Sequence, residues 1–202
     1  MKSFVLQACR SLLEAAKSGD VNSTKRLVKC SGDNSNGSCS STDGFRFTPL
    51  TYAARNGHVE VVRVLLEAGT NLERSSASGW TALHEAARQE RLEVCRLLLD
   101  WGAKVDPLND GKDTPLHLAT RHGHFSVVKL LAESGADLGL KNDIGHTALH
   151  NAARSGHLSV VKLLVERGAD VRVMNDKGQT ASDVARWEEK IEVAEWLEKV
   201  LV

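Results

Sequence analysis

Two groups of histidines in the sequence have the residue types of a metal or catalytic site. In the segment TALHEAAR (Thr81–Arg88), His84 and Glu85 open the H-E-x-x-H pattern, in which two histidines bind zinc and the glutamate acts as base. Arg88 occupies the place of the second histidine, and a guanidinium cannot ligate a metal. The second group is His117, His122 and His124, whose imidazoles would suit a transition metal. Whether either group is a site depends on the elements that position these side chains.

The segment TALHEAAR is one copy of a repeated unit. Similar segments begin at Thr48 (TPLTYAAR), Thr114 (TPLHLATR) and Thr147 (TALHNAAR), with a degenerate copy at Thr180 (TASDVARW), and the interval is 33 residues each time. Longer apolar segments recur with the same interval, as in GHFSVVKLLAESG from Gly123 and GHLSVVKLLVERG from Gly156. A fixed period of this length is typical of repeat proteins.

Each unit has the sequence signals of a pair of short helices. Thr114 supplies a capping hydroxyl, and Pro115 follows at the first helical position, where its missing N–H costs nothing. Gly123 ends this helix by accepting a positive φ. A second helix then carries a wide apolar surface over residues 127–131 and stops at Gly135. The following segment is rich in Asp, Asn and Gly and predicts an extended turn or hairpin between units.

A single helix pair cannot bury such an apolar face, so stacking of neighbouring pairs is required. The sequence resembles the ankyrin repeat family, whose unit is a β-turn plus two antiparallel helices with a T-P-L-H-x-A signature. The resemblance covers about Leu12 to Leu201 and implies an α-solenoid of stacked ankyrin repeats, each a helix-turn-helix with a β-hairpin turn. We expect six units, two of them caps. The expected order is an N-terminal capping repeat (1–30), an extended Ser/Gly/Asn-rich loop (31–44), ankyrin repeats (45–75, 76–108, 109–141 and 142–174) and a C-terminal capping repeat (175–202).

Two departures from the repeat pattern affect the turns. Gln89-Glu90-Arg91 replaces x-Gly-His, so one turn between helices lacks its glycine. Before Thr114, the glycine comes one residue early, at Gly111, which predicts a displaced hairpin in that repeat.

Composition favours a neutral protein of thin repeats. Aromatic residues make up only 4% of the chain, whereas a single deep core would use more large rings. The 26 basic and 26 acidic residues cancel, so no overall field attracts nucleic acid or anionic lipid. The cysteines Cys9, Cys30, Cys39 and Cys95 form no C-x-x-C pair, and no segment approaches the about 20 apolar residues that span a bilayer. The apolar run in MKSFVLQACR is too short for a signal peptide. We therefore expect a cytoplasmic or nuclear monomer with no membrane partner.

The resemblance explains the histidines without a metal. In ankyrin repeats, a histidine at the position of His84, His117 and His150 braces the turn by hydrogen bonding to the backbone. His117 and His124 therefore belong to the framework, and we expect no metal site. No nucleophile elbow, P-loop or dinucleotide fingerprint is present, so we predict no enzyme activity, no catalytic residue and no cofactor.

Positions that vary among the repeats are the candidates for binding. One face of the first helices, which lines the concave groove in ankyrin proteins, carries Tyr52, His122 and an arginine in every full repeat: Arg55, Arg88, Arg121 and Arg154. This ladder of arginines could bind an acidic peptide or helix through bidentate contacts. The alternative is that these arginines are a common framework feature and that Glu85 neutralises Arg88 one turn away.

Aromatic residues at the hairpin tips are the second group of binding candidates. Phe45, Phe47 and Trp80 precede the threonines of their units, and exposed aromatic side chains near arginines are typical of interface hot spots. Packing of Phe47 against the extended loop is the alternative. We expect the other tryptophans, Trp101, Trp187 and Trp196, to be core or cap residues.

The sequence therefore predicts a non-catalytic scaffold or adaptor that binds one or more proteins through the groove and the hairpin tips. The alternative is a polyanion- or RNA-binding protein that uses the arginine ladder, although nucleic acid is disfavoured by the zero net charge. The candidate partner-binding residues are Phe45, Phe47, Tyr52, Arg55, Trp80, Arg88, Arg121, His122 and Arg154.

Overall fold

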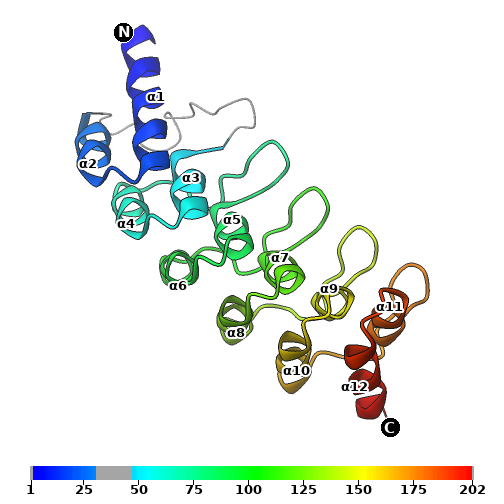
Figure 1. Ribbon diagram of the computed structural model, residues 1–202. Coiled ribbons are helices and arrows are strands. Elements are labelled where there is room, and N and C mark those ends of the chain that lie inside the picture. The colour runs from blue at the N-terminus through cyan, green and yellow to red at the C-terminus, as the bar shows by residue number, and fades with distance from the viewer. Residues whose placement is uncertain (1, 31–46, 202) are drawn as a thin grey trace. The chain divides into compact units, whose positions relative to one another are not determined.

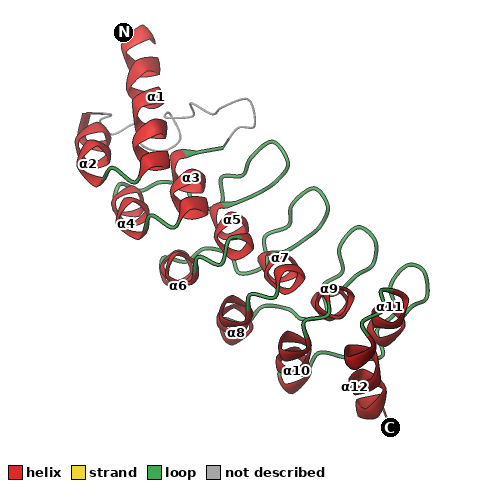
Figure 2. Cartoon of the chain, in the orientation of Figure 1, coloured by secondary structure: helices red, strands yellow, loops and turns green. Residues whose placement is uncertain are grey.

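The computed structural model describes residues 2–30 and 47–201 (Figure 1). Within these ranges the chain forms twelve helices and no strand (Figure 2). The extended loop 31–44 and Phe45 lie outside the described residues.

The helices form pairs within two compact units, residues 1–107 and 108–202. The first unit contains α1 (Lys2–Ser18), α2 (Val21–Cys30), α3 (Pro49–Asn56), α4 (Val59–Glu67), α5 (Ala82–Arg88) and α6 (Leu92–Asp100). In it, α1, α3 and α5 stack in one layer, and α2, α4 and α6 stack in a second.

The second unit repeats this arrangement. It contains α7 (Pro115–His122), α8 (Phe125–Glu133), α9 (Ala148–Ser155), α10 (Leu158–Glu166), α11 (Ala181–Trp187) and α12 (Ile191–Leu201). Helices α7, α9 and α11 form one layer, and α8, α10 and α12 form the other. The predicted stacked helix pairs are therefore confirmed in both units.

The cores of both layers consist of small and aliphatic side chains. Ala53, Ala86 and Ala152 on the first helices are fully buried, which lets neighbouring helices approach closely. Cys95 lies in the core of α6, and burial raises the pKa of its thiol to about 12, so the thiol stays protonated and unreactive. None of the described helices is long and apolar enough to cross a membrane.

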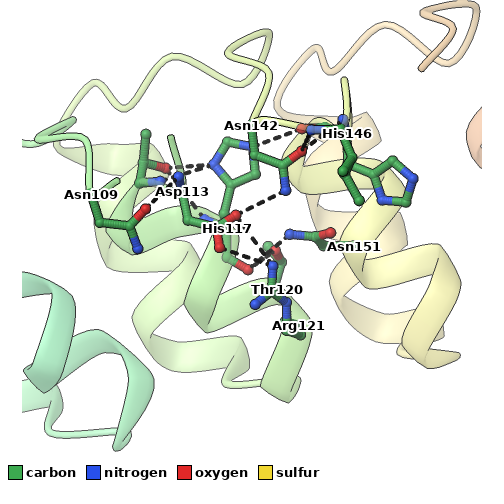
Figure 3. Close-up of polar contacts among 10 residues, drawn as sticks. Asn109, Asp113, His117, Thr120, Arg121, Asn142, His146 and Asn151 are labelled. Carbon is green, nitrogen blue, oxygen red and sulfur yellow. Dashed lines mark hydrogen bonds and ion pairs between the residues drawn. The ribbon is translucent and has the colours of Figure 1, made fainter. Parts of the chain in front are cut away.

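In the second unit, a threonine and a histidine join the first helix of a repeat to the hairpin that follows it. His117 Nδ1 accepts a hydrogen bond from the backbone N–H of Thr114 (3.2 Å), so the ring proton sits on Nε2. Nε2 then donates to the carbonyl oxygen of His146 in the next hairpin (3.0 Å; Figure 3). His150 makes the same pair of bonds, with Thr147 and with the carbonyl of Gln179. The predicted bracing role of these histidines is thus confirmed.

The turns that lack glycine keep their geometry. Glu90, Lys112 and Glu189 adopt φ of 56°, 55° and 56°, in the left-handed region that the equivalent glycines occupy in other repeats. The hairpin before Thr114 closes with a bond from Asn109 N–H to the carbonyl of Asp113. Its counterpart one repeat later joins residues 142 and 146. The predicted displacement of this hairpin is therefore wrong, because Lys112 takes the strained conformation and keeps the register.

Replacing Glu90 by glycine should stabilise the protein. Glu90 is exposed and holds a left-handed backbone conformation, which costs a residue with a Cβ more than it costs glycine. We expect Glu90→Gly to raise the free energy of unfolding by about 0.5–1 kcal/mol, measured by urea denaturation. The matched control is Gly57→Ala at the equivalent turn, where a Cβ would lie 2.8 Å from Cδ of Arg91. That variant should lose stability, and a loss in Glu90→Gly would contradict this explanation.

The bracing histidines should make stability depend on pH. Burial lowers the pKa of His150 from 6.5 to about 4, because the folded protein holds the neutral ring. Between these values the unfolded chain binds the proton more readily. The stabilisation is therefore full above pH 6.5 and is lost as the pH falls toward 4, by on the order of 3 kcal/mol.

Urea denaturation between pH 4 and 7 measures this dependence. His150→Gln keeps a capping side chain at the third helical position and should show a shallower loss of stability on acidification than the wild type. His122→Gln, at an exposed position, should keep the wild-type dependence. An unchanged slope in His150→Gln would contradict the assignment.

Candidate protein-interaction site

Five of the predicted binding residues meet at one pocket in the first unit. Its volume is about 360 Å³, and we call it the Trp80 pocket. The hairpin before α5 and the exposed ends of α3 and α5 enclose it. Its lining residues are Phe47, Tyr52, Arg55, Ser76, Ser78, Trp80, Glu85 and Arg88.

The hairpin that carries Trp80 is fixed by its first residue. The backbone N–H of Ser76 donates to the carbonyl of Trp80 (2.9 Å). The Ser76 hydroxyl accepts hydrogen bonds from the N–H groups of Ser78 and Trp80 (3.3 and 3.2 Å). Thr81 then caps α5 directly after the tryptophan. These contacts hold the half-buried indole over the start of the helix.

Aromatic and cationic side chains form the walls of the Trp80 pocket. The guanidinium carbon of Arg88 lies 5.3 Å from the centre of the Trp80 ring, within the range of a cation–π contact. Phe47 and Tyr52 pack with ring centres 5.4 Å apart at a tilt of 57°. Lys17 Nζ lies 4.6 Å from the centre of the Tyr52 ring. Phe47 therefore packs on the neighbouring helix α3 and contributes to the pocket wall.

A buried carboxylate forms the floor of the Trp80 pocket. Glu85 is only 2% exposed, and its Oε2 atom makes no hydrogen bond. Burial raises the pKa of Glu85, and the positive charges of Arg55 and Arg88 oppose this shift. Arg55 forms an ion pair with Glu85, with its Nε 3.9 Å from Oε2. The sequence suggested Glu85 as a residue that neutralises the charge of Arg88. Its position in the pocket floor, beside Arg55, follows from the packing of α3 against α5.

Apart from Phe45, which lies outside the described residues, the remaining predicted residues lie in the second unit and do not share one site. Arg121 Nη2 donates to both carboxylate oxygens of Asp113 (3.2 and 3.0 Å), and Asn142 Nδ2 donates to Oδ1 of the same residue (2.9 Å; Figure 3). This network ties Arg121 to its own hairpin. His122 is exposed and stacks on His124, with ring centres 5.6 Å apart.

Arg154 lines a second pocket, of about 410 Å³, which we call the Trp187 pocket. The hairpin before α11 and the ends of α9 and α11 enclose it. The other lining residues are Ile144, His146, Asn175, Lys177, Gln179, Val184, Trp187 and Glu188. Trp187 was expected to be a core or cap residue, but its side chain is 80% exposed, so that prediction is wrong. Trp101 is also exposed, at 44%.

The described side chains do not form a metal site. Within residues 2–30 and 47–201, no group of three or more His, Cys, Asp or Glu side chains is arranged to hold a metal ion. The hydrogen bonds of His117 to Thr114 and His146 already occupy both of its ring nitrogens.

Comparison with known proteins assigns the family. The family model for ankyrin repeats (3 copies) matches residues 12–109 and 116–199, and the chain belongs to the ankyrin repeat family. Over 72 residues, 36% of the chain, it is 39% identical to the probable E3 ubiquitin-protein ligase XBOS32 of Oryza sativa subsp. japonica.

Two further relatives match segments of similar length. The chain is 41% identical over 70 residues, 35% of its length, to the transient receptor potential cation channel subfamily A member 1 of Homo sapiens. It is 38% identical over 72 residues, 36% of its length, to the E3 ubiquitin-protein ligase XBAT32 of Arabidopsis thaliana. The matches cover 14%, 6% and 14% of XBOS32, the channel subunit and XBAT32 respectively, so the shared part is the repeat segment.

The buried charge of Glu85 should cost stability at neutral pH. Burial raises the pKa of Glu85 above its ordinary value of 4.5, so the folded state favours the protonated acid. The loss of folding stability therefore begins as the pH rises above 4.5 and is complete above the raised pKa. We expect Glu85→Gln to increase the free energy of unfolding at pH 7 and to have little effect near pH 4, measured by urea denaturation. Glu60→Gln, at an exposed i,i+3 pair with Arg63, should change stability little at either pH. Destabilisation by Glu85→Gln at pH 7 would contradict this.

Proposed function

We propose that the chain is a non-catalytic protein-interaction module and that the Trp80 pocket is its main docking site for an acidic partner segment. The observation that carries the proposal is the meeting of Trp80, Arg55 and Arg88 at one open pocket. Tryptophan and arginine are the residues most enriched at interface hot spots, and both are present here on rigid elements.

Charge favours an acidic occupant. Two arginines and one glutamate line the Trp80 pocket, and the arginines are exposed whereas the glutamate is buried. The accessible charge is therefore positive. The exposed guanidinium groups can bind carboxylates in a bidentate manner while the aromatic side chains pack against the partner's chain.

The ion pairs weigh against a polyanion- or RNA-binding function. Three of the four arginines in the ladder already lie next to a carboxylate: Arg55 with Glu85, Arg121 with Asp113, and Arg154 with Glu188. Such pairs reduce the positive potential that phosphate groups would need. The zero net charge of the chain points the same way. A partner protein with a local acidic segment fits these observations better.

The proposal includes a role as a scaffold or adaptor, in monomeric form, in the cytoplasm or nucleus. The four cysteines without a C-x-x-C pair, and the buried unreactive thiol of Cys95, support a reducing compartment. Ligase and channel activities belong to the much longer relatives. From these relatives we carry over to this chain only the repeat segment and its role in protein binding.

Affinity capture from cell lysate with matched variants tests the proposal. Trp80→Ala/Arg88→Glu alters the pocket, and Trp101→Ala/Arg63→Glu makes the same chemical changes at exposed positions of the same unit outside it. Circular dichroism and melting first establish that both variants are folded. We expect proteins retained by the wild type to be lost, or weakened at least about tenfold, with the pocket variant only. Equal retention by both variants would refute the Trp80 pocket as the docking site.

A further inference from the structure

The two pockets occupy the same place in the repeat. Positions separated by three repeats of 33 residues line both of them. Arg55 corresponds to Arg154, Trp80 to Gln179, and Arg88 to Trp187. The scaffold therefore builds the same kind of pocket twice, once in each unit, and the side chains decide what each pocket accepts.

The floor of the Trp187 pocket is apolar where that of the Trp80 pocket is charged. Val184 stands at the position of Glu85 and is 5% exposed. Ile144, at the hairpin tip, is 47% exposed, and Trp187 is 80% exposed. Large apolar side chains that remain this exposed around a depression favour a partner with an apolar side chain to insert.

The rim of the Trp187 pocket carries an excess of positive charge. Arg154 Nε lies 3.1 Å from a carboxylate oxygen of Glu188, so this pair is neutral overall. Lys177 is exposed at the hairpin and adds one further positive charge to the lining residues. The charge balance therefore favours acidic groups beside the apolar floor.

His146 adds a neutral imidazole ring to the wall. Asn175 Oδ1 accepts from the backbone N–H groups of Lys177 and Gln179 (2.9 and 3.0 Å), so the Asn175 amide nitrogen faces His146 Nε2 (3.1 Å). Nε2 must then accept, and the ring proton sits on Nδ1, which is buried and makes no hydrogen bond. Burial lowers the pKa of His146, and the neighbouring Asn151 side chain opposes that shift. This wall therefore presents a neutral ring and no acidic group.

From this geometry we infer that the Trp187 pocket is a second docking site, for a partner segment in which an apolar side chain is flanked by acidic residues. The apolar side chain packs between Trp187 and Ile144 above Val184. The acidic residues lie beside Lys177 and Arg154. This site goes beyond the proposed function, because it has its own ligand chemistry and does not require the Trp80 pocket.

Titration of the full chain with a synthetic peptide tests this inference by nuclear magnetic resonance. The probe is one phenylalanine flanked on each side by three glutamates. The chain has four tryptophans, so substitution assigns each of the four indole N–H signals. We expect the Trp187 signal to shift saturably and that of Trp101 to stay in place. Replacement of the phenylalanine by alanine, or of the glutamates by lysines, should weaken binding at least about tenfold.

Variants separate this site from the Trp80 pocket. We expect Lys177→Glu to weaken the peptide about fivefold, and Trp187→Ala at least about tenfold as judged by fluorescence anisotropy of a labelled peptide. Trp101→Ala should leave the affinity unchanged, and Trp80→Ala/Arg88→Glu should leave the shift of the Trp187 signal unchanged. The inference is overturned if the Trp187 signal stays fixed up to about 1 mM peptide, or if only the Trp80 signal moves. It is equally overturned if the Trp187 signal follows protein concentration and sedimentation shows that a second copy of the chain fills the pocket.

Discussion

The hydrogen bond from a helix-capping histidine to the next hairpin is the contact on which the rest of the second unit depends. His117 and His150 each cap their own helix through Nδ1 and reach the following hairpin through Nε2–H. One neutral ring thus fixes a helix start and the position of the next hairpin at the same time. Because His146 and Gln179 line the Trp187 pocket, these contacts set the geometry of that pocket.

The same scaffold produces two pockets of different chemistry, one in each unit. In the first, Glu85 lies beneath Trp80 and two arginines, and in the second, Val184 lies beneath Trp187. The repeat defines the pocket's place, and under our proposal the varying residues define what binds there.

The period of 33 residues, the capping threonines and the framework histidines made the helix pairs predictable, because these signals act within one unit. The left-handed conformations of Glu90 and Lys112 could not be predicted in the same way. There the packing of neighbouring elements imposes the turn on residues that do not favour it. Sequence pattern consequently predicted a shifted hairpin that the hydrogen bonds of the next repeat show to be in register.

The candidate site was predictable in part. Trp80 and Arg88 share a short segment, so their meeting followed from sequence spacing. The carboxylate partners of the arginines could not be predicted from spacing, because they lie in the next repeat: Arg55 pairs with Glu85, and Arg154 pairs with Glu188. The exposure of Trp187 was missed, although the residue ends α11, the first helix of its repeat. Its alignment with Arg88, an outward-facing position, was the signal that could have revealed it.

Amide hydrogen exchange of the chain alone and in complex with its captured partner tests the central claim most directly. The account predicts slower exchange on binding over the hairpin and helix at residues 76–88, with no change along α4. Protection confined to α4 and the other second helices, with residues 76–88 unchanged, would show that the partner binds the opposite face and would contradict the account.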